Sequence, residues 1–246
     1  MSAILEVNGL TRYFGGLAAV KDVTFAVPEG SIFGLIGPNG AGKTTLFSMV
    51  AGALQPSGGT VRFRGRDVTG IRPYEAVASG IVRTHQIVRP FKSMTVLENV
   101  MVATYFGRHG ATNPRVARER AMEVLAFVGI EHVAGQQAAV LPIGQQKLLE
   151  LARALAAKPD LLLCDEIAGG LTDAETQNVL GLLRKIRERG TTILYIEHDM
   201  RAVMSVCDRI VVLNYGQKLA EGTPAEIQRN PAVIEAYLGT SAAEAG

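Results

Sequence analysis

Several features that would define a class of protein are missing from this sequence of 246 residues. No apolar segment approaches the roughly 18 residues that a helix needs to cross a bilayer, and the first nine residues lack the basic start and apolar stretch of a secretory signal. Lysine and arginine do not gather into a run that could follow a phosphate backbone, and the formal net charge is only +2. Nucleic acid is therefore not indicated as a partner, and any role at a membrane would come through another protein.

Cysteine is scarce, and internal repeats and low-complexity linkers are absent. The two cysteines, Cys164 and Cys207, lie far apart in apolar surroundings and lack metal-ligand spacing, which favours buried, reduced thiols in a cytosolic protein over a disulfide. With 48% hydrophobic residues the chain can bury a sizeable core. We expect one domain over residues 1–240 and a flexible tail over residues 241–246.

The spacing of apolar residues predicts a mixed α/β fold. Short β-rich runs precede a helix, a turn-rich hairpin region and a long helical region, at residues 4–7, 20–27, 31–36, 43–50, 56–70 and 95–128. Strands and helices then alternate, with a helix ending at 157, strands at 160–164, 191–196 and 209–213, a helix at 173–189 and short helices at 224–229 and 231–238. This alternation predicts a parallel sheet flanked by helices, with a helical subdomain at about residues 90–157.

One segment fits the spacing of a phosphate-binding loop and lies between an apolar strand and a helix. It consists of Gly37, Pro38, Asn39, Gly40, Ala41, Gly42, Lys43, Thr44 and Thr45. Glycine permits the tight backbone path, and backbone N–H groups and the helix N-terminus would hold a polyphosphate. Lys43 should reach the β- and γ-phosphates, and the Thr44 hydroxyl could bind Mg²⁺. The alternative, a glycine-rich turn that only caps a helix, does not account for the complete spacing.

An acidic pair and a histidine follow two later strands. Asp165 and Glu166 end the apolar run at 161–164, an arrangement that places one acid near Mg²⁺ and the next near an attacking water. A solvated acidic pair is the alternative, and the phosphate-binding loop upstream decides against it. His198 follows another apolar strand, at the edge where a parallel sheet presents ligand-contacting groups. The other three histidines, His85, His109 and His132, are interpreted as ordinary surface residues.

Between the loop and the acidic strand, the run Leu-Pro-Ile-Gly-Gln-Gln-Lys at residues 141–147 opens a helix. With this run, the set of motifs resembles the ATPases of ABC transporters, which have a phosphate-binding loop, a glutamine loop, an LSGGQ-like signature, an acidic strand end and a switch histidine in this order. Gln86, Gly144 and Gln145 match the glutamine loop and the signature. The resemblance implies a P-loop NTPase of the ABC ATPase type, with an N-terminal antiparallel β part and a helical subdomain, that hydrolyses ATP.

A narrower resemblance is to the importer ATPases for branched-chain amino acids, and it rests on residues 14–17, 83–86, 94–100, 196–200 and 230–239. The related urea importers share residues 172–175. Three alternatives remain: an exporter ATPase of the lipopolysaccharide type, a soluble ABC ATPase of ribosomes or DNA repair, and a non-hydrolysing regulator. Residues 83–86 favour the importers, the chain lacks a second ATPase unit or a coiled-coil insertion, and the intact Glu166 and His198 argue against a regulator.

The family resemblance also implies roles for single residues. Phe14 would stack on adenine, although Tyr13 is a rival and a core role is open. Gln86, Thr44 and Asp165 would contact Mg²⁺, Glu166 would activate water, and His198 would hold the γ-phosphate. Residues 169–172 would cross to a second ATPase subunit, either a copy or a sister chain.

The implied partners are this second ATPase, integral-membrane permease subunits and, indirectly, a solute-binding protein. The implied location is cytoplasmic, on the inner face of the cell membrane. The segment at residues 89–94 is our candidate for docking on the permease, with an ordinary packed loop as the alternative.

The sequence departs from the family pattern at three positions. Pro142 replaces the signature serine, Ile143 replaces a signature glycine, and Ile167 stands where a proline usually follows the catalytic acid. Gly144, Gln145 and the helix N-terminus could still bind phosphate. We therefore expect a weakened signature.

Overall fold

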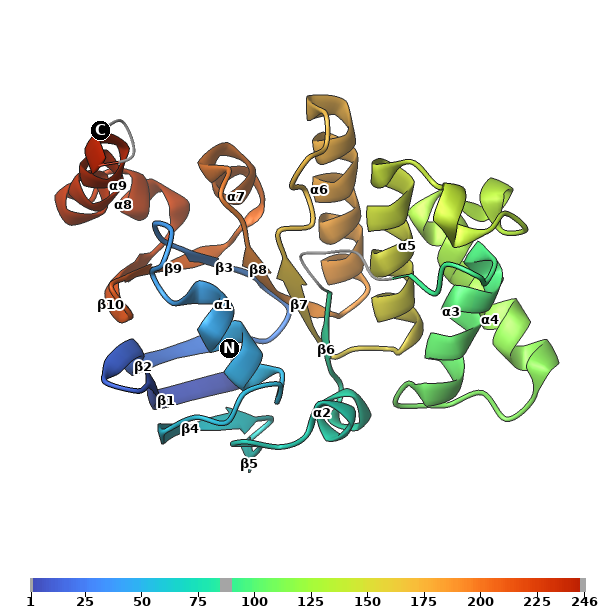
Figure 1. The fold of residues 1–246 in the computed structure, drawn as a ribbon, viewed down its shortest axis with the longest axis horizontal. Coiled ribbons are helices and arrows are strands. Elements are labelled where there is room, and N and C mark those ends of the chain that lie inside the picture. The colour runs from blue at the N-terminus through green and yellow to red at the C-terminus, as the bar shows by residue number, and fades with distance from the viewer. Residues whose placement is uncertain (1, 85–89, 244–246) are drawn as a thin grey trace.

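The computed structural model describes residues 2–84 and 90–243, and two sheets form its centre (Figure 1). A four-stranded antiparallel sheet has the order β2-β1-β4-β5, with β1 (Ala3–Phe14), β2 (Leu17–Pro28), β4 (Gly58–Phe63) and β5 (Arg66–Asp67). A six-stranded sheet has the order β10-β9-β3-β8-β7-β6, with β3 (Ile32–Ile36), β6 (Ile81–Arg83), β7 (Leu161–Asp165), β8 (Thr192–Ile196), β9 (Arg209–Asn214) and β10 (Gln217–Gly222). The predicted α/β class with an antiparallel N-terminal part is confirmed.

The three central strands of the larger sheet are parallel and completely buried. β3 pairs with β8, and β8 with β7, so that Ile196 is level with both Leu35 and Asp165. Strands covered on both faces need a nearly continuous apolar sequence, which these segments have except for Thr192 at the start of β8 and Asp165 at the end of β7. Their carboxyl ends lie at one edge of the sheet, where the phosphate-binding loop, the acidic pair and the histidine all begin.

Helices flank this sheet, and one group of them lies together at one side (Figure 1). This group contains α3 (Val96–Phe106), α4 (Pro114–Val128) and α5 (Ile143–Ala156), with the short 3-10 helices η1 (Glu131–Val133) and η2 (Ala138–Val140) nearby. The remaining helices are α1 (Lys43–Val50), α2 (Pro73–Ser79), α6 (Asp173–Glu188), α7 (Met200–Val206), α8 (Pro224–Gln228) and α9 (Pro231–Ala243). The elements α2, β6 and β10 were not predicted from the sequence.

The end of the chain was predicted to form a flexible tail from residue 241. α9 extends to Ala243, and the flexibility of the tail stays a prediction. The last residues include alanines, which are strong helix formers, and no proline interrupts them.

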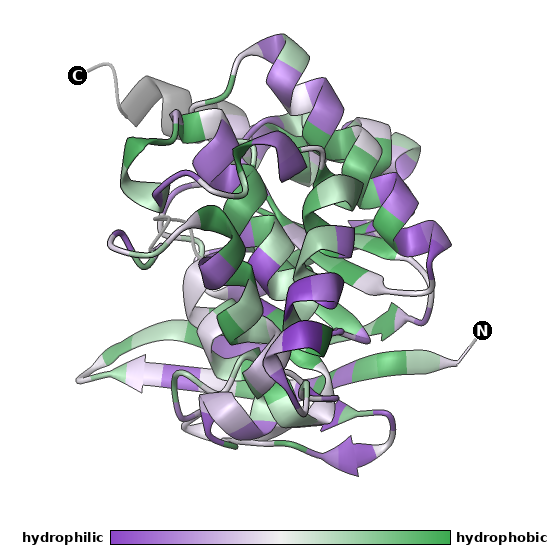
Figure 2. Ribbon diagram, turned by 90° about the vertical axis from the view of Figure 1, so that its right-hand side faces the viewer, coloured by the Kyte–Doolittle hydropathy of each residue, from purple (hydrophilic) through white to green (hydrophobic). Residues whose placement is uncertain are grey.

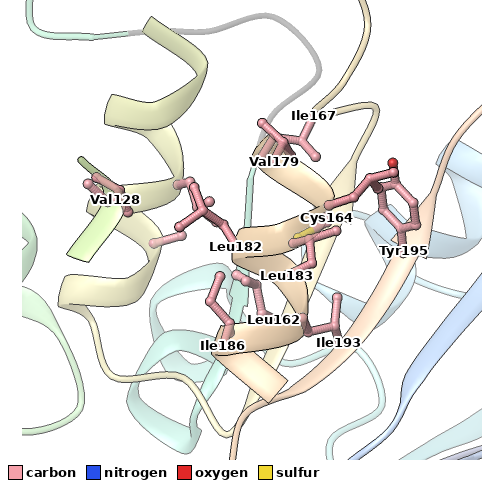
Figure 3. Close-up of a cluster of buried hydrophobic side chains, with 14 of the residues drawn as sticks. Val128, Leu162, Cys164, Ile167, Val179, Leu182, Leu183, Ile186, Ile193 and Tyr195 are labelled. Atoms are coloured by element: carbon pink, nitrogen blue, oxygen red, sulfur yellow. The ribbon is translucent and has the colours of Figure 1, made fainter. Parts of the chain in front are cut away.

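The core beside the site is formed where α6 lies on β7 and β8 (Figure 3). Leu183 and Ile186 of α6 pack in the same buried cluster as Leu162 and Ile193 of the strands. Each such side chain contributes about 1.5–3 kcal/mol through burial. This packing fixes the strand ends from which the site residues project.

The two cysteines, Cys164 and Cys207, are buried and unpaired, as predicted. Burial raises the pKa of both thiols. Figure 2 shows hydrophobic residues along the strands and mixed hydropathy along the helices. Within the part of the chain that the structure describes, every helix is too short or too polar to cross a membrane.

Candidate nucleotide site

The phosphate-binding loop connects β3 to α1 and needs glycine at two points. Gly37 has a φ of 152° and Gly42 a φ of 98°. A Cβ atom at these positions would lie 2.2 Å from the carbonyl oxygen of Leu213 and 2.4 Å from that of Ala19, respectively. Only glycine fits such contacts with main chain, so the loop can follow its tight path into the N-terminus of α1.

Lys43 is buried inside this loop. Its Nζ donates hydrogen bonds to the carbonyl oxygens of Gly37, at 2.7 Å, and Pro38, at 2.9 Å. Burial lowers the pKa of the Lys43 ammonium group, while the charges of Glu166 and Asp165 oppose this effect. The ammonium group therefore lies between the loop and the two acids, where a phosphate could replace the carbonyl oxygens as its partner.

A pocket of about 310 Å³ opens above the loop, and it is lined by Ala19, Asn39, Gly40, Ala41, Gly42, Lys43, Thr44, Thr45, Glu166 and His198. Three segments that are far apart in the sequence meet here. They are the phosphate-binding loop, Glu166 directly after β7, and His198 two residues after the end of β8. The structure thus brings together the loop, the second acid and the histidine that the sequence had singled out. Ala19 was not anticipated.

Glu166 and His198 are in direct contact, through Oε1 of the carboxylate and Nε2 of the imidazole. Glu166 has a φ of 49°, in the left-handed region that costs a residue with a side chain about 1–3 kcal/mol. Its backbone is held on both sides: its N–H donates to the carbonyl of Ile196 at 3.0 Å, and its carbonyl accepts from Lys147 Nζ at 2.9 Å. These bonds fix the direction in which the carboxylate points. Ile167, at the family's proline position, is buried in the core.

Asp165 is fully buried, and its two carboxylate oxygens differ. Oδ2 is 2.5 Å from a guanidinium nitrogen of Arg83, whereas Oδ1 has no hydrogen-bond partner. A buried oxygen without a partner next to a phosphate site fits a hard cation such as Mg²⁺, and the hydroxyl of Thr44, which lines the pocket, would be a second ligand. Across residues 2–84 and 90–243, no group of three or more His, Cys, Asp or Glu side chains could hold a metal alone, so water and phosphate would supply most ligands. Gln86 lies outside the described residues.

Phe14 ends β1 and is 48% exposed. The guanidinium carbon of Arg12 lies 4.8 Å from the centre of its ring. Its ring is therefore open to solvent rather than part of the core, as a platform for a base would be. Tyr13 is exposed to a similar degree, and neither lines the pocket described above.

The signature segment lies at the N-terminus of α5, away from the pocket. Pro142 precedes the helix and makes no side-chain cap, and Ile143 is half exposed. Gly144 is buried, and a Cβ there would lie 2.3 Å from Oε1 of Glu175. Gln145 is partly buried. Neither Gly144 nor Gln145 lines the pocket over the chain's own loop.

Other contacts at the site had no local signal in the sequence. Burial raises the pKa of Tyr237 on α9 to about 12, and a hydrogen bond with the backbone of Gly37 opposes the rise. Oε1 of Glu175 on α6 lies close to Gly144 at the start of α5, 2.3 Å from where a Cβ of residue 144 would be. Such contacts join segments whose proximity only the fold reveals.

A phosphate-binding loop, a buried acid and a histidine at the carboxyl edge of a parallel sheet define a P-loop nucleotide hydrolase. Residues 20–169 match the family described as ABC transporter, and residues 217–243 match the one described as branched-chain amino acid ATP-binding cassette transporter. The chain belongs to the ABC transporter ATP-binding family, and its enzymatic activity is ATP hydrolysis.

Full-length relatives support this assignment. The chain is 45% identical to the high-affinity branched-chain amino acid transport ATP-binding protein BraF of Pseudomonas aeruginosa, over 96% of this chain and 98% of that protein. It is 42% identical to LivG of Escherichia coli, a protein of the same description, with the same coverage.

Solved structures agree with the assignment. The ADP conformation of MJ1267, an ATP-binding cassette of an ABC transporter, superposes with a TM-score of 0.88 at 31% identity, over 97% of this chain and all of that chain. A dimeric post-hydrolysis state of the cassette MJ0796, bound to ADP and Pi, gives a TM-score of 0.80 at 26% identity, over 89% and 98% of the two chains.

Proposed function

We propose that the chain powers the import of branched-chain amino acids, or of a related small polar solute, by hydrolysing ATP. In this proposal residues 1–240 form one ATPase domain, with a helical subdomain at about residues 90–157. The observation that carries the hydrolytic part is the contact of Glu166 with His198 above the phosphate-binding loop. The solute class rests on relatives of the same length whose names specify branched-chain amino acids, and on the C-terminal match over residues 217–243.

The chemistry needs little covalent participation from the protein. Lys43 would neutralise charge on the phosphates, Glu166 would orient or deprotonate the attacking water, and His198 would hold the γ-phosphate in line. Thr44, Asp165 and Gln86 would hold Mg²⁺, which when bound neutralises charge on the phosphate oxygens. Phe14 would carry the adenine ring.

The position of the signature supports a second ATPase subunit in this proposal. The signature residues Gly144 and Gln145 do not line the pocket over the chain's own loop, so each ATP would be covered by the signature of the opposite subunit. The cassette MJ0796, at 26% identity, has been solved as a dimer. Residues 169–172 would form the crossing loop between the subunits.

The membrane partner would dock on the loop before α3. In the described part of this loop, residues 90–94, Phe91 exposes 43% of its surface and Met94 36%. The loop is nevertheless held in place, because Asn99 bonds both backbone groups of Phe91 at 2.8 and 3.0 Å, and the guanidinium of Arg153 lies 4.8 Å from the Phe91 ring centre. A fixed loop with exposed apolar side chains suits a permease on the inner face of the membrane.

Transport measured in sealed vesicles that contain the complete transporter would test this function. ATP-dependent accumulation of leucine, isoleucine or valine is expected when the solute-binding protein is supplied, together with release of phosphate. A matched complex that carries Glu166→Gln should bind ATP without accumulating solute. Phosphate release without amino-acid uptake would keep the ATPase and reject the solute, and movement of a lipid-linked solute outwards would favour the exporter alternative.

A further inference from the structure

A buried carboxylate without a role in the proposed chemistry lies directly before the histidine. Glu197 follows β8 and is only 4% exposed, although glutamate is rarely buried without partners. Burial raises the pKa of Glu197, and the neighbouring charge of Glu166 acts in the same direction. The burial of an acidic side chain at this position therefore needs a structural or functional explanation.

Three donors surround the Glu197 carboxylate, and all of them point at its oxygens. Oε1 accepts from the backbone N–H of Ala168 at 3.0 Å and from the hydroxyl of Tyr195 at 3.3 Å. Oε2 accepts from the backbone N–H of His198 at 3.0 Å. Tyr195 itself is fully buried in the core beside Cys164 (Figure 3). Its hydroxyl therefore holds the Glu197 carboxylate from the core side.

The two backbone donors belong to different loops of the site. Ala168 lies two residues after Glu166 and directly before the segment 169–172 that is proposed to cross to the second subunit. The other loop carries His198, whose imidazole contacts Glu166. Since Glu197 bonds only the backbone of His198, the imidazole of His198 keeps its contact with Glu166 and is 48% exposed.

We propose that Glu197 is a positioning residue that joins the loop carrying His198 to the loop that follows Glu166, so that the water-activating acid, the γ-phosphate contact and the crossing segment hold one relative geometry. The inference rests on the proposed function, because Glu197 would act only through the proposed roles of Glu166 and His198. Glu197 itself would not contact ATP. It predicts an effect on the chemical step and little effect on nucleotide affinity.

Only a carboxylate can accept the hydrogen bonds from Ala168 and His198 on both of its oxygens. Each of its oxygens accepts one backbone N–H, and carboxylates accept but do not donate. In Glu197→Gln one of the two oxygens becomes an NH₂ group, which would face a backbone N–H and repel it. The variant keeps the size of the side chain and breaks the joint between Ala168 and His198.

The test compares Glu197→Gln with Tyr195→Phe in the complete transporter. Tyr195→Phe removes the hydroxyl donor from the same carboxylate but leaves both backbone bonds, so it is the matched control. We expect Glu197→Gln to lower kcat for ATP by about ten- to a hundredfold, the usual effect of losing a hydrogen bond to a charged group. KM for ATP and Kd for ADP should stay within about twofold, and Tyr195→Phe should keep wild-type kcat. Should Glu197→Gln not fold, Glu197→Asp withdraws the carboxylate from both loops and should show the same loss.

Coupling between the two residues separates positioning from plain stabilisation. If Glu197 acts through His198, adding Glu197→Gln to His198→Ala should lower the remaining turnover much less than it lowers that of the wild type. Equal losses in both backgrounds, an unchanged kcat, or a loss confined to ATP affinity would overturn the inference while leaving the ATPase assignment intact. Absence of turnover in the wild-type transporter would overturn the proposed function and this inference with it.

Discussion

The guanidinium group of Arg83 lies 2.5 Å from the carboxylate of Asp165, and this ion pair is almost enclosed by the core. Arg83 also donates to the hydroxyl of Ser48 at 3.0 Å, and its guanidinium carbon lies 5.8 Å from the ring centre of Phe47. One side chain thus connects β6, β7 and α1. It occupies one oxygen of Asp165 and leaves the other without a hydrogen-bond partner.

Replacing Arg83 with alanine should destabilise the fold strongly. Removing one partner of a buried pair leaves an uncompensated charge, which costs about 3–5 kcal/mol. Chemical denaturation measures this change in the free energy of unfolding. The control is Arg72→Ala, which breaks the exposed pair of Arg72 with Glu75 and should leave the free energy of unfolding almost unchanged, because solvent screens such a pair. Equal costs for the two variants would contradict the structural weight given to the buried pair.

Glu166→Gln should keep nucleotide binding and lose most turnover. The variant removes the base but leaves the phosphate-binding loop intact, and general-base catalysis contributes about 10²–10⁴-fold. Steady-state phosphate release and calorimetric binding of ATP measure the two effects separately. Near-normal hydrolysis by the variant would refute the role assigned to Glu166.

Lys43→Ala should weaken nucleotide binding itself. A hydrogen bond to a charged group is worth about 1.5–3 kcal/mol, so the Kd for ATP should rise by roughly ten- to a hundredfold. Calorimetry with Lys21→Ala, an exposed lysine that does not line the pocket, provides the comparison. An unchanged Kd would count against the predicted contact with the phosphates.

Glu166→Gln should also change its oligomeric state with ATP. If each ATP is held by the loop of one subunit and the signature of the other, as proposed, trapping ATP should convert monomers into dimers. Light scattering with and without ATP measures the mass. A mass that does not change would reject the two-subunit arrangement of identical chains and leave pairing with a different ATPase subunit.

Pro142→Ser should strengthen the opposite site. The restored hydroxyl could bond the γ-phosphate held by the partner subunit, a gain of about ten- to a hundredfold in turnover at that site. If the partner is a sister ATPase, this gain should survive when Glu166→Gln disables the chain's own acid. A gain that vanishes in the double variant, or no gain, would show that Pro142 does not limit the opposite site.

The order and type of the main elements could be predicted from the sequence because the local signals were strong. The glycine spacing before α1 predicted a phosphate-binding loop, and the apolar runs of β7 and β8 predicted buried strands. The same signals placed Glu166 and His198 at the correct edge of the sheet. Short elements escaped: β6 spans only three residues, too few for a period to show.

The contacts that hold the site residues could not be predicted, because they join distant parts of the chain. Arg83 and Asp165 are 82 residues apart. Lys147 on α5 donates to the carbonyl of Glu166 in the loop after β7. Ala168 in that loop donates to Glu197, which follows β8. No local pattern records such proximity. It follows only from the order of strands in the sheet.

The burial of both cysteines has a practical consequence for observing closure. Cys164 and Cys207 lie in the core with raised pKa values, so little reactive thiolate is exposed, and the chain contains no tryptophan. A single cysteine introduced at Ile143, which is half exposed at the start of α5, would therefore be the one readily labelled thiol among the described residues. A fluorescent dye attached there would report the approach of the second subunit, with little labelling of the two native cysteines and no tryptophan fluorescence from this chain.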